Sequence, residues 1–257
     1  MPMTPQQKQA TKEVIKNSLQ DKFRDYAPET KHMPFHTRLL GKDRMALFSF
    51  IHSLNTNFGT RIFEPVAVEL ARNKFVATAK QATPPKIISS QAQVVIQKIM
   101  DDLSIAQEKP AKNEELERIR AVCQKGDVRE VKLTKIDIEL RDSDDNIFWI
   151  DLKTVKPNKG SFKEYKRTLL EWAAVALYEN PDAKIHTLIA IPYNPYEPKP
   201  YDRWTMAGML DLEAELKVAE ELWDFVGGQD TYQDLLDCFE QVGMAMRTEI
   251  DDYFKNF

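Results

Sequence analysis

The chain has few cysteines, few histidines and no long apolar run, and each of these shortages excludes a class of protein. Its two cysteines, Cys123 and Cys238, lie far apart, so we expect neither a disulfide framework nor a cysteine-based zinc site. His32 and His36 alone do not make a metal site. No stretch approaches the roughly 18 apolar residues of a membrane-spanning helix, and the N-terminus lacks the apolar core of a signal peptide. We therefore expect a reduced, cytoplasmic protein.

The chain also lacks an overall excess of basic charge. Its formal net charge is −4, which argues against a nucleic-acid binder whose whole surface is basic. The charge is unevenly distributed, because residues 153–167 carry six basic residues against one acid, whereas residues 211–224 carry six acids against one lysine. A basic segment suits contact with a polyanion, since lysine and arginine neutralise phosphates. The alternative for such a segment is a solvated helix face.

The most informative segment is an apolar run, Asn146–Lys153, that ends on Asp151 and Lys153. Strand periodicity places these two side chains on the same face. Asp137 precedes an acidic turn at residues 141–146, so a hairpin would bring it beside Asp151. Two adjacent carboxylates repel each other unless a cation lies between them, and Mg²⁺ prefers such oxygen ligands. The sequence thus predicts a divalent-cation site, where Lys153 orients the attacking water or stabilises charge on a phosphate.

Two alternatives stay open for these charged residues. Asp151 and Lys153 can instead form a solvated cross-strand pair, although the apolar residues 148–150 indicate a buried strand, where unpaired charges are rare. Glu64 lies in the first turns of a predicted helix, just after a glycine-containing segment. It either reaches the metal site from that helix or complements the positive helix N-terminus.

The order of predicted elements indicates an α/β fold. Strands are expected at residues 128–140 and 147–155, followed by a helix from Ser161 to about Tyr178 and a strand at 185–191. The last strand is nearly all apolar, as in a sheet that is buried on both faces. Ser161 has glutamate three residues later, the spacing of a capping box, so we expect its side chain to cap the helix.

We expect a single domain made of three stretches. Residues 1–125 form a mainly helical front, 126–195 the sheet core, and 196–257 a loop with C-terminal helices. A polar connector at residues 107–115 precedes the core. The loop is rich in proline and aromatic residues. Trp204 is expected to hold it against the core, and the alternative is that Trp204 enters a DNA groove together with the tyrosines and basic residues of the loop.

These residues together resemble a known nuclease core. Asp137, the string Asp151-Leu-Lys153, a helix and an apolar strand resemble the PD-(D/E)xK core, although Ile136 stands where the name of the motif has proline. The longer string Ile150–Asn158 resembles the TdeIII-type group of type II restriction endonucleases, together with further short strings. Those strings are Leu169–Trp172, Pro192–Tyr196, Arg203-Trp204 and Trp223–Gly228. The resemblance covers residues 35–257 and is strongest from residue 130 onward.

The resemblance implies both a fold and an activity. The fold would be a restriction-endonuclease-like core, a mixed central sheet flanked by helices, with extra N- and C-terminal helices. The activity would be Mg²⁺-dependent hydrolysis of both DNA strands at a short palindrome similar to GGNCC. Asp137, Asp151 and Glu64 would hold the metal, and Lys153 would assist the water. A homodimer is implied, as is a cognate DNA methyltransferase that is functionally paired with the enzyme but not bound to it.

Contact with double-stranded DNA is expected from basic side chains in three places: before the second predicted helix, along the basic segment and in the proline-rich loop. The predicted DNA-contacting residues are Arg38, Lys156, Lys159, Lys163, Lys166, Arg167, Lys199 and Arg203. Two other functions stay open. One is a structure-specific repair or recombination nuclease with the same core, and the other is a DNA-binding protein without catalysis.

Overall fold

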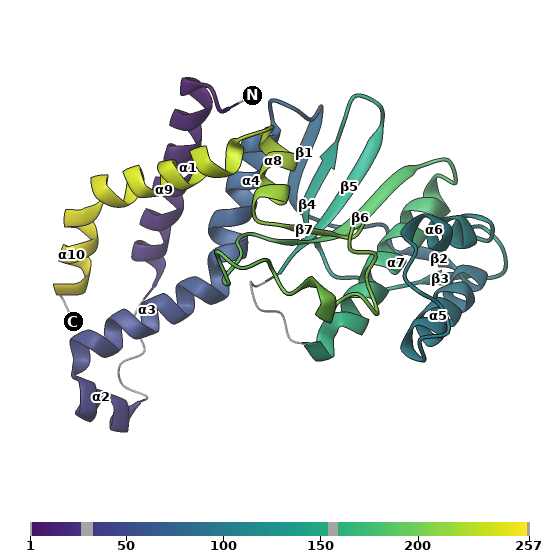
Figure 1. Cartoon of the computed structure of the whole chain (residues 1–257), viewed down its shortest axis with the longest axis horizontal. Coiled ribbons are helices and arrows are strands. Elements are labelled where there is room, and N and C mark those ends of the chain that lie inside the picture. Colours follow the sequence, from purple (N-terminus) through teal and green to yellow (C-terminus); the bar gives the residue numbers. More distant parts are fainter. Residues whose placement is uncertain (1, 27–32, 154–158, 256–257) are drawn as a thin grey trace.

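A five-stranded mixed sheet lies at the centre of the molecule (Figure 1). The computed structural model describes residues 2–26, 33–153 and 159–255. The strand order is β1-β4-β5-β6-β7, with β1, β4 and β5 antiparallel and β5, β6 and β7 parallel. The strands are β1 Ala77–Ala82, β4 Ile136–Arg141, β5 Asn146–Leu152, β6 Lys184–Ile191 and β7 Leu216–Val218. The expected α/β fold with a mixed sheet flanked by helices is confirmed.

The β4–β5 hairpin forms because its acidic turn satisfies its own backbone. The Asp142 carboxylate accepts hydrogen bonds from the backbone N–H groups of Asp144 and Asn146, each at 2.9 Å. Asp145 takes a positive φ of 66°, which aspartate tolerates better than most residues. The expected hairpin is therefore present. Its first strand is shorter than expected, because Val128–Glu130 forms β3 and pairs with β2, Ile87–Ser89, in a separate two-stranded sheet.

Helices cover both faces of the central sheet, and each face has its own apolar core. The cover on one face comes from α5, α6 and α7, and on the other from α1, α4, α8 and α9 (Figure 1). These helices are α1 Pro5–Asp25, α4 Glu64–Ala71, α5 Ser90–Ser104, α6 Lys112–Arg120, α7 Phe162–Glu179, α8 Glu220–Gly227 and α9 Thr231–Ala245. No helix in the described residues is long and apolar enough to cross a membrane.

Two further helices project from this body. They are α2, Pro34–Leu40, and α3, Lys42–Phe58, and they extend to the lower left of Figure 1. The C-terminal helix α10, Arg247–Lys255, packs near the base of α3. Short helical turns complete the fold: a π turn at Gly59–Phe63 and 3₁₀ turns at Lys159–Ser161 and Arg203–Thr205.

Three local expectations are corrected. The sheet is not confined to residues 126–195, because β1 comes from the front and β7 from the tail. Strand β1 was missed since ATAKQA is rich in residues that are depleted in strands. Ser161 makes no capping bond with its side chain. Trp204 does not pin its loop to the core, because it is 71% exposed.

Candidate active site

The ends of β4 and β5 bring two carboxylates and a lysine together. Ile138 pairs with Ile150, and one further step along this antiparallel register places Asp137 opposite Asp151. The Asp137 Oδ2 atom accepts a hydrogen bond from the Leu152 N–H at 2.8 Å. Asp151 is 7% exposed, and its Oδ1 lies 2.7 Å from the Lys153 Nζ. The hairpin therefore gathers these charges at one corner of the sheet.

Lys153 is held in place by three separate contacts. It lies just beyond the end of β5, and its backbone N–H donates to the Ala190 carbonyl of β6 at 2.9 Å. Its ammonium bonds Asp151 and also lies 4.7 Å from the centroid of the Tyr165 ring on α7. Its side chain keeps 26% of its surface exposed, so the charge is fixed but still reachable from solvent.

Glu64 approaches the same corner from a bent helix. Helices α3 and α4 are joined by the π turn at Gly59–Phe63, where the Glu64 N–H bonds to the Gly59 carbonyl. Pro65 follows Glu64 and has no N–H to donate, which favours a bend at this point. Glu64 is 2% exposed. Of the two alternatives for Glu64, the structure places it at the strand corner.

Gln81 links Glu64 to the strand carboxylates. Its side-chain Nε2 donates to Glu64 Oε2 at 2.9 Å and to Asp137 Oδ1 at 3.2 Å. Gln81 also has a φ of +53°, a left-handed conformation that a residue with a side chain rarely takes. This backbone geometry in β1 turns the amide towards both acids. One neutral side chain thus fills the space between Glu64 and Asp137.

The acids at this corner outnumber the positive charges beside them. Burial raises the pKa of Asp137 to about 7, with Asp151 and Glu64 adding to the rise and Lys153 opposing it. Burial also raises the pKa of Glu64, against hydrogen bonds from Gln81 and Thr60 that favour its charged form. Excess negative charge in a partly buried place favours a cation there.

The donor set fits a small divalent cation with some rearrangement. Within the described residues, no three His, Cys, Asp or Glu side chains form a ready metal cage. Mg²⁺ is commonly held by only one or two carboxylates, with water and phosphate oxygens as its other ligands. Asp137 and Asp151 meet that requirement. Glu64 can join them only if the Gln81 amide releases its two carboxylates.

The basic residues predicted to contact DNA divide into several groups. Lys163, Lys199 and Arg38 are exposed, but Arg38 lies on the projecting helix α2, far from β5 in Figure 1.

Two of the predicted arginines have partners at the surface. Arg167 bonds Gln97 at 2.7 Å, and Arg203 pairs with Glu221 at 2.7 Å. Lys156 lies outside the described residues, as does the side chain of Lys159.

Lys166 is a correction to the predicted DNA contacts. It is 0% exposed, and its ammonium lies 2.5 Å from Glu115 Oε2 and 2.6 Å from Glu215 Oε2. Lys112 pairs with the other oxygen of Glu215 at 2.8 Å. Although burial alone raises the pKa of Glu215, the two lysines hold it below its usual value. Lys166 therefore belongs to a buried ion cluster and does not contact DNA.

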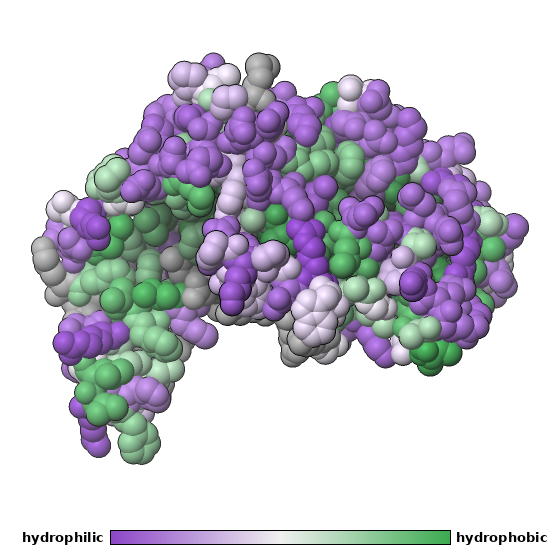
Figure 2. All heavy atoms as spheres, viewed as in Figure 1, coloured by the Kyte–Doolittle hydropathy of each residue, from purple (hydrophilic) through white to green (hydrophobic). Residues whose placement is uncertain are grey.

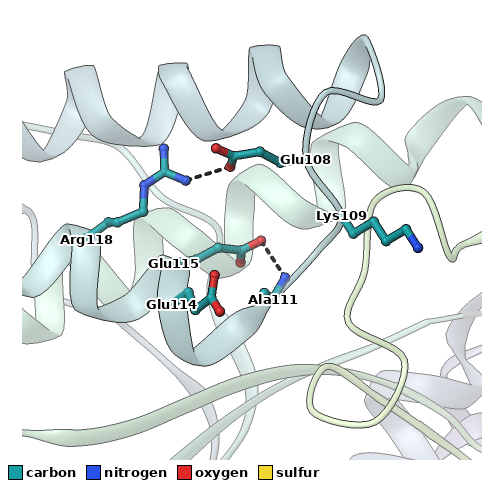
Figure 3. A pocket seen from close by; sticks show the side chains of 6 residues that line it. All are labelled: Glu108, Lys109, Ala111, Glu114, Glu115 and Arg118. Carbon is teal, nitrogen blue, oxygen red and sulfur yellow. Dashed lines mark hydrogen bonds and ion pairs between the residues drawn. The ribbon is translucent and has the colours of Figure 1, made fainter.

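A surface pocket lies beside this ion cluster, away from the strand corner. It has a volume of about 530 Å³ and is built around the start of α6 (Figure 3). Arg118 pairs with Glu108 at 2.7 Å, and Glu115 turns towards the Ala111 N–H. Three glutamates against one lysine and one arginine make the lining unsuitable for DNA phosphates. The lining residues are Glu108, Lys109, Ala111, Glu114, Glu115 and Arg118.

Sequence reasoning missed the neighbours of the acids. Gln81 lies far from Asp151 along the chain, and only the pairing of β1 with β4 brings it close. Tyr165 is nearer in sequence, but apolar periodicity assigns it to the inner face of its helix, and the packing of α7 places its ring against Lys153. The charge of Lys80, beside Gln81, opposes part of the rise that burial gives to the pKa of Glu64. A polar Lys-Gln pair in an otherwise alanine-rich segment is the one signal that was available.

Comparisons with known proteins identify the family of the chain. A family model described as "Type II restriction endonuclease, HinfI" matches residues 3–243. The chain is 26% identical to the type II restriction enzyme MjaII of Methanocaldococcus jannaschii, over 92% of this chain and 70% of MjaII. It is 24% identical to HgiEI and HgiCII of Herpetosiphon aurantiacus, over 84% of this chain and 79% and 80% of theirs. The expectation of a type II restriction endonuclease is confirmed, and the matched family is HinfI, where a TdeIII-type group was expected.

Proposed function

The chain belongs to the HinfI family of type II restriction endonucleases, and from that premise we propose that the β4–β5 corner hydrolyses DNA with Mg²⁺. Enzymes of this class are site-specific endonucleases that act on double-stranded DNA, and they generally need a divalent metal ion. The proposal assigns the chemistry to the PD-(D/E)xK arrangement of Asp137, Asp151 and Lys153. The observation that carries it is the 2.7 Å contact between Lys153 and Asp151, directly opposite Asp137.

Each acid has an oxygen for the cation. Asp151 offers Oδ2, since its Oδ1 faces Lys153, and Asp137 offers Oδ1 once Gln81 moves away. Glu64 is the proposed third acid. When bound, the cation neutralises charge on the phosphate and makes a water molecule more acidic. Gln81 keeps Glu64 and Asp137 in place before the cation arrives.

Lys153 acts on the phosphate itself. Its ammonium is held by Asp151 and by the Tyr165 ring, so little reorganisation is needed when negative charge develops during the reaction. The water oxygen forms a bond to phosphorus while one bridging P–O bond breaks. A fixed ammonium stabilises the extra charge on the non-bridging oxygens at that moment. The same ammonium can orient the water.

DNA binding is proposed along the surface next to this corner. Lys163 and Arg167 lie on the first turns of α7, and Lys199 and Arg203 follow β6. Phosphate contacts from such residues position the duplex without reading its sequence. Recognition of a site similar to GGNCC rests on the resemblance alone. Since the described residues of each chain form one such corner, cutting both strands is proposed to need a homodimer, and a cognate methyltransferase is proposed to protect host DNA.

Plasmid cleavage tests the proposal. Wild-type protein with Mg²⁺ should convert a sequenced plasmid into discrete fragments, and mapping their ends should give one short palindromic site. Lys153→Ala should abolish the fragments while keeping DNA binding in a gel-shift assay. The matched control is Lys16→Ala, which removes an exposed lysine of α1. Smeared or junction-dependent products would indicate a repair nuclease, and binding without cleavage under any divalent ion would indicate a non-catalytic protein.

A further inference from the structure

The projecting α2–α3 hairpin carries a concentration of exposed apolar side chains. Of the fifteen exposed large apolar side chains among the described residues, seven lie in this hairpin. Phe35 and Leu39 on α2 are each 82% exposed. The seven are Met33, Phe35, Leu39, Leu40, Leu47, Phe48 and Ile51. Figure 2 shows apolar surface along this projecting lobe at the lower left. Apolar patches of this kind mark interaction sites.

Helix α3 has an inner side that packs against the rest of the chain and an outer side that carries exposed apolar residues. Helix α3 buries Met45, Ala46 and Phe50. At 100° per residue, Leu47, Phe48 and Ile51 point to the opposite side of α3. Phe50 anchors the inner side in an aromatic cluster, with ring centroids 5.4 Å from Phe23, 5.8 Å from Tyr253 and 5.2 Å from Phe254. The outer side of α3 is left without cover from the described part of its own chain.

The turn between the two helices is also fixed. Gly41 has a φ of +91°, a backbone conformation that favours glycine over residues with a side chain. The Gly41 N–H closes α2 on the Thr37 carbonyl at 3.0 Å, and Arg44 donates to the Leu40 carbonyl at 2.9 Å. The turn therefore fixes the orientation of α2 relative to α3, and with it the positions of their exposed apolar side chains.

The exposed area matches what a stable dimer needs. At roughly 200 Å² for each large apolar side chain, the exposed parts of the seven amount to roughly 800 Å². A specific interface of standard size buries about 800 Å² on each partner. In a two-fold dimer both copies use the same patch, and an apolar patch is complementary to itself. Phosphate groups of DNA, by contrast, gain nothing from phenylalanine and leucine.

We propose that the α2–α3 hairpin is the surface through which two copies of this chain associate. The inference rests on the proposed function, because cutting two strands takes two active sites and the proposed function assigns one strand corner to each chain. It goes further by assigning the contact to a patch remote from Asp151 and from the pocket at α6. The acids at the strand corner of each copy would then take no part in the contact between the two copies.

Sedimentation velocity over a concentration series tests this assignment without DNA or metal. Wild-type protein should sediment as a dimer of about 60 kDa, twice the 29.8 kDa of one chain. The double variant Leu39→Glu/Phe48→Glu should sediment as a monomer, with association weakened at least 10-fold. Val94→Glu is the matched control, because it places a charge on an exposed apolar position of α5 and should stay dimeric. Circular dichroism should show equal helix content in all three proteins.

Two results would overturn the assignment. They are a wild type that stays monomeric at all concentrations and a double variant that stays dimeric. A double variant that stays dimeric and also loses DNA binding would instead make the hairpin a DNA contact. Lys153→Ala separates this proposal from the proposed function, since it should remain a dimer yet cut nothing. A dimer that never cuts DNA counts against the function alone.

Discussion

The buried ion cluster and the strand corner both gather charged side chains, and they differ in balance and in exposure. In the buried ion cluster, Lys112 and Lys166 face Glu115 and Glu215, every charge has a partner, and all four are at most 4% exposed as side chains. At the strand corner, Glu64, Asp137 and Asp151 are three acids, and within the described residues the one ion pair among them joins Asp151 to the Lys153 ammonium. A buried cluster with equal numbers of positive and negative charges has a structural role. A partly exposed cluster with an excess of negative charge can accept a cation and a phosphate.

Removing one partner from the balanced cluster should have the largest effect. Lys166→Met leaves the buried Glu115 without its cationic partner and Glu215 with only one of its two, so the free energy of unfolding should fall by about 3–5 kcal/mol. Urea denaturation measures this change. Lys163→Met, an exposed lysine on the same helix, should change it by less than about 0.5 kcal/mol. Equal effects from both variants would mean that the cluster does not contribute to stability.

Removing a carboxylate from the unbalanced corner should affect activity and leave stability intact. Asp151→Asn should slow DNA cleavage by on the order of 10²–10³-fold, because a fixed charge that acts on the reaction is lost. Its thermal midpoint should stay or rise, since one of three crowded acids becomes neutral. The control is Asp237→Asn on the exposed side of α9. An unfolded Asp151→Asn protein would show that the corner is structural after all.

Adding Mg²⁺ should stabilise the protein through the strand corner and not through the buried ion cluster. A ligand that binds only the folded protein, at 100 times its dissociation constant, stabilises by about 2.7 kcal/mol. Thermal unfolding of wild type should therefore move to higher temperature with Mg²⁺, and that of Asp137→Asn should move much less. Lys166→Met should show the same rise in unfolding temperature as wild type, because its substitution lies in the buried ion cluster. A Mg²⁺ response that survives in Asp137→Asn would place the cation elsewhere.

The smallest expected effect concerns Gln81. Gln81→Ala removes two hydrogen bonds to buried acids, so the metal-free protein should lose about 1–2 kcal/mol of stability. The same change should strengthen Mg²⁺ binding in calorimetry, because no amide then competes for Glu64 and Asp137. Gln233→Ala removes one exposed amide bond on α9 and should do neither. Weaker Mg²⁺ binding by Gln81→Ala would mean that the amide helps to form the site.

The sequence was most informative where neighbours along the chain decide the structure. The β4–β5 hairpin follows from alternating residues and an acidic turn, and its register brings Asp137 opposite Asp151. The length of α7 and the buried strand β6 were also predicted, because apolar periodicity and a terminating Asn-Pro define them locally. These elements depend on contacts within about fifty residues, and pattern reasoning covers that range.

The errors concern residues whose environment comes from distant parts of the chain. Lys166 shares a basic stretch with Lys163, yet α6 and the segment before β7 enclose it with two glutamates. A run of charges cannot show which members face inward, since that depends on how α7 packs. Strand β1 was missed for a related reason, because its pairing with β4 outweighs a weak strand propensity.

By itself, the sequence determined the α/β class, the hairpin and the pair of strand-end acids followed by a lysine, because strand period and turn chemistry act between near neighbours. Only the tertiary structure decided that Gln81 links Glu64 to Asp137, that Lys166 is buried in a neutral cluster, and that Leu47, Phe48 and Ile51 of α3 are exposed. The physical reason is the same in each case. Desolvation and partner choice depend on which helix covers which face, and that is settled by packing across the whole chain.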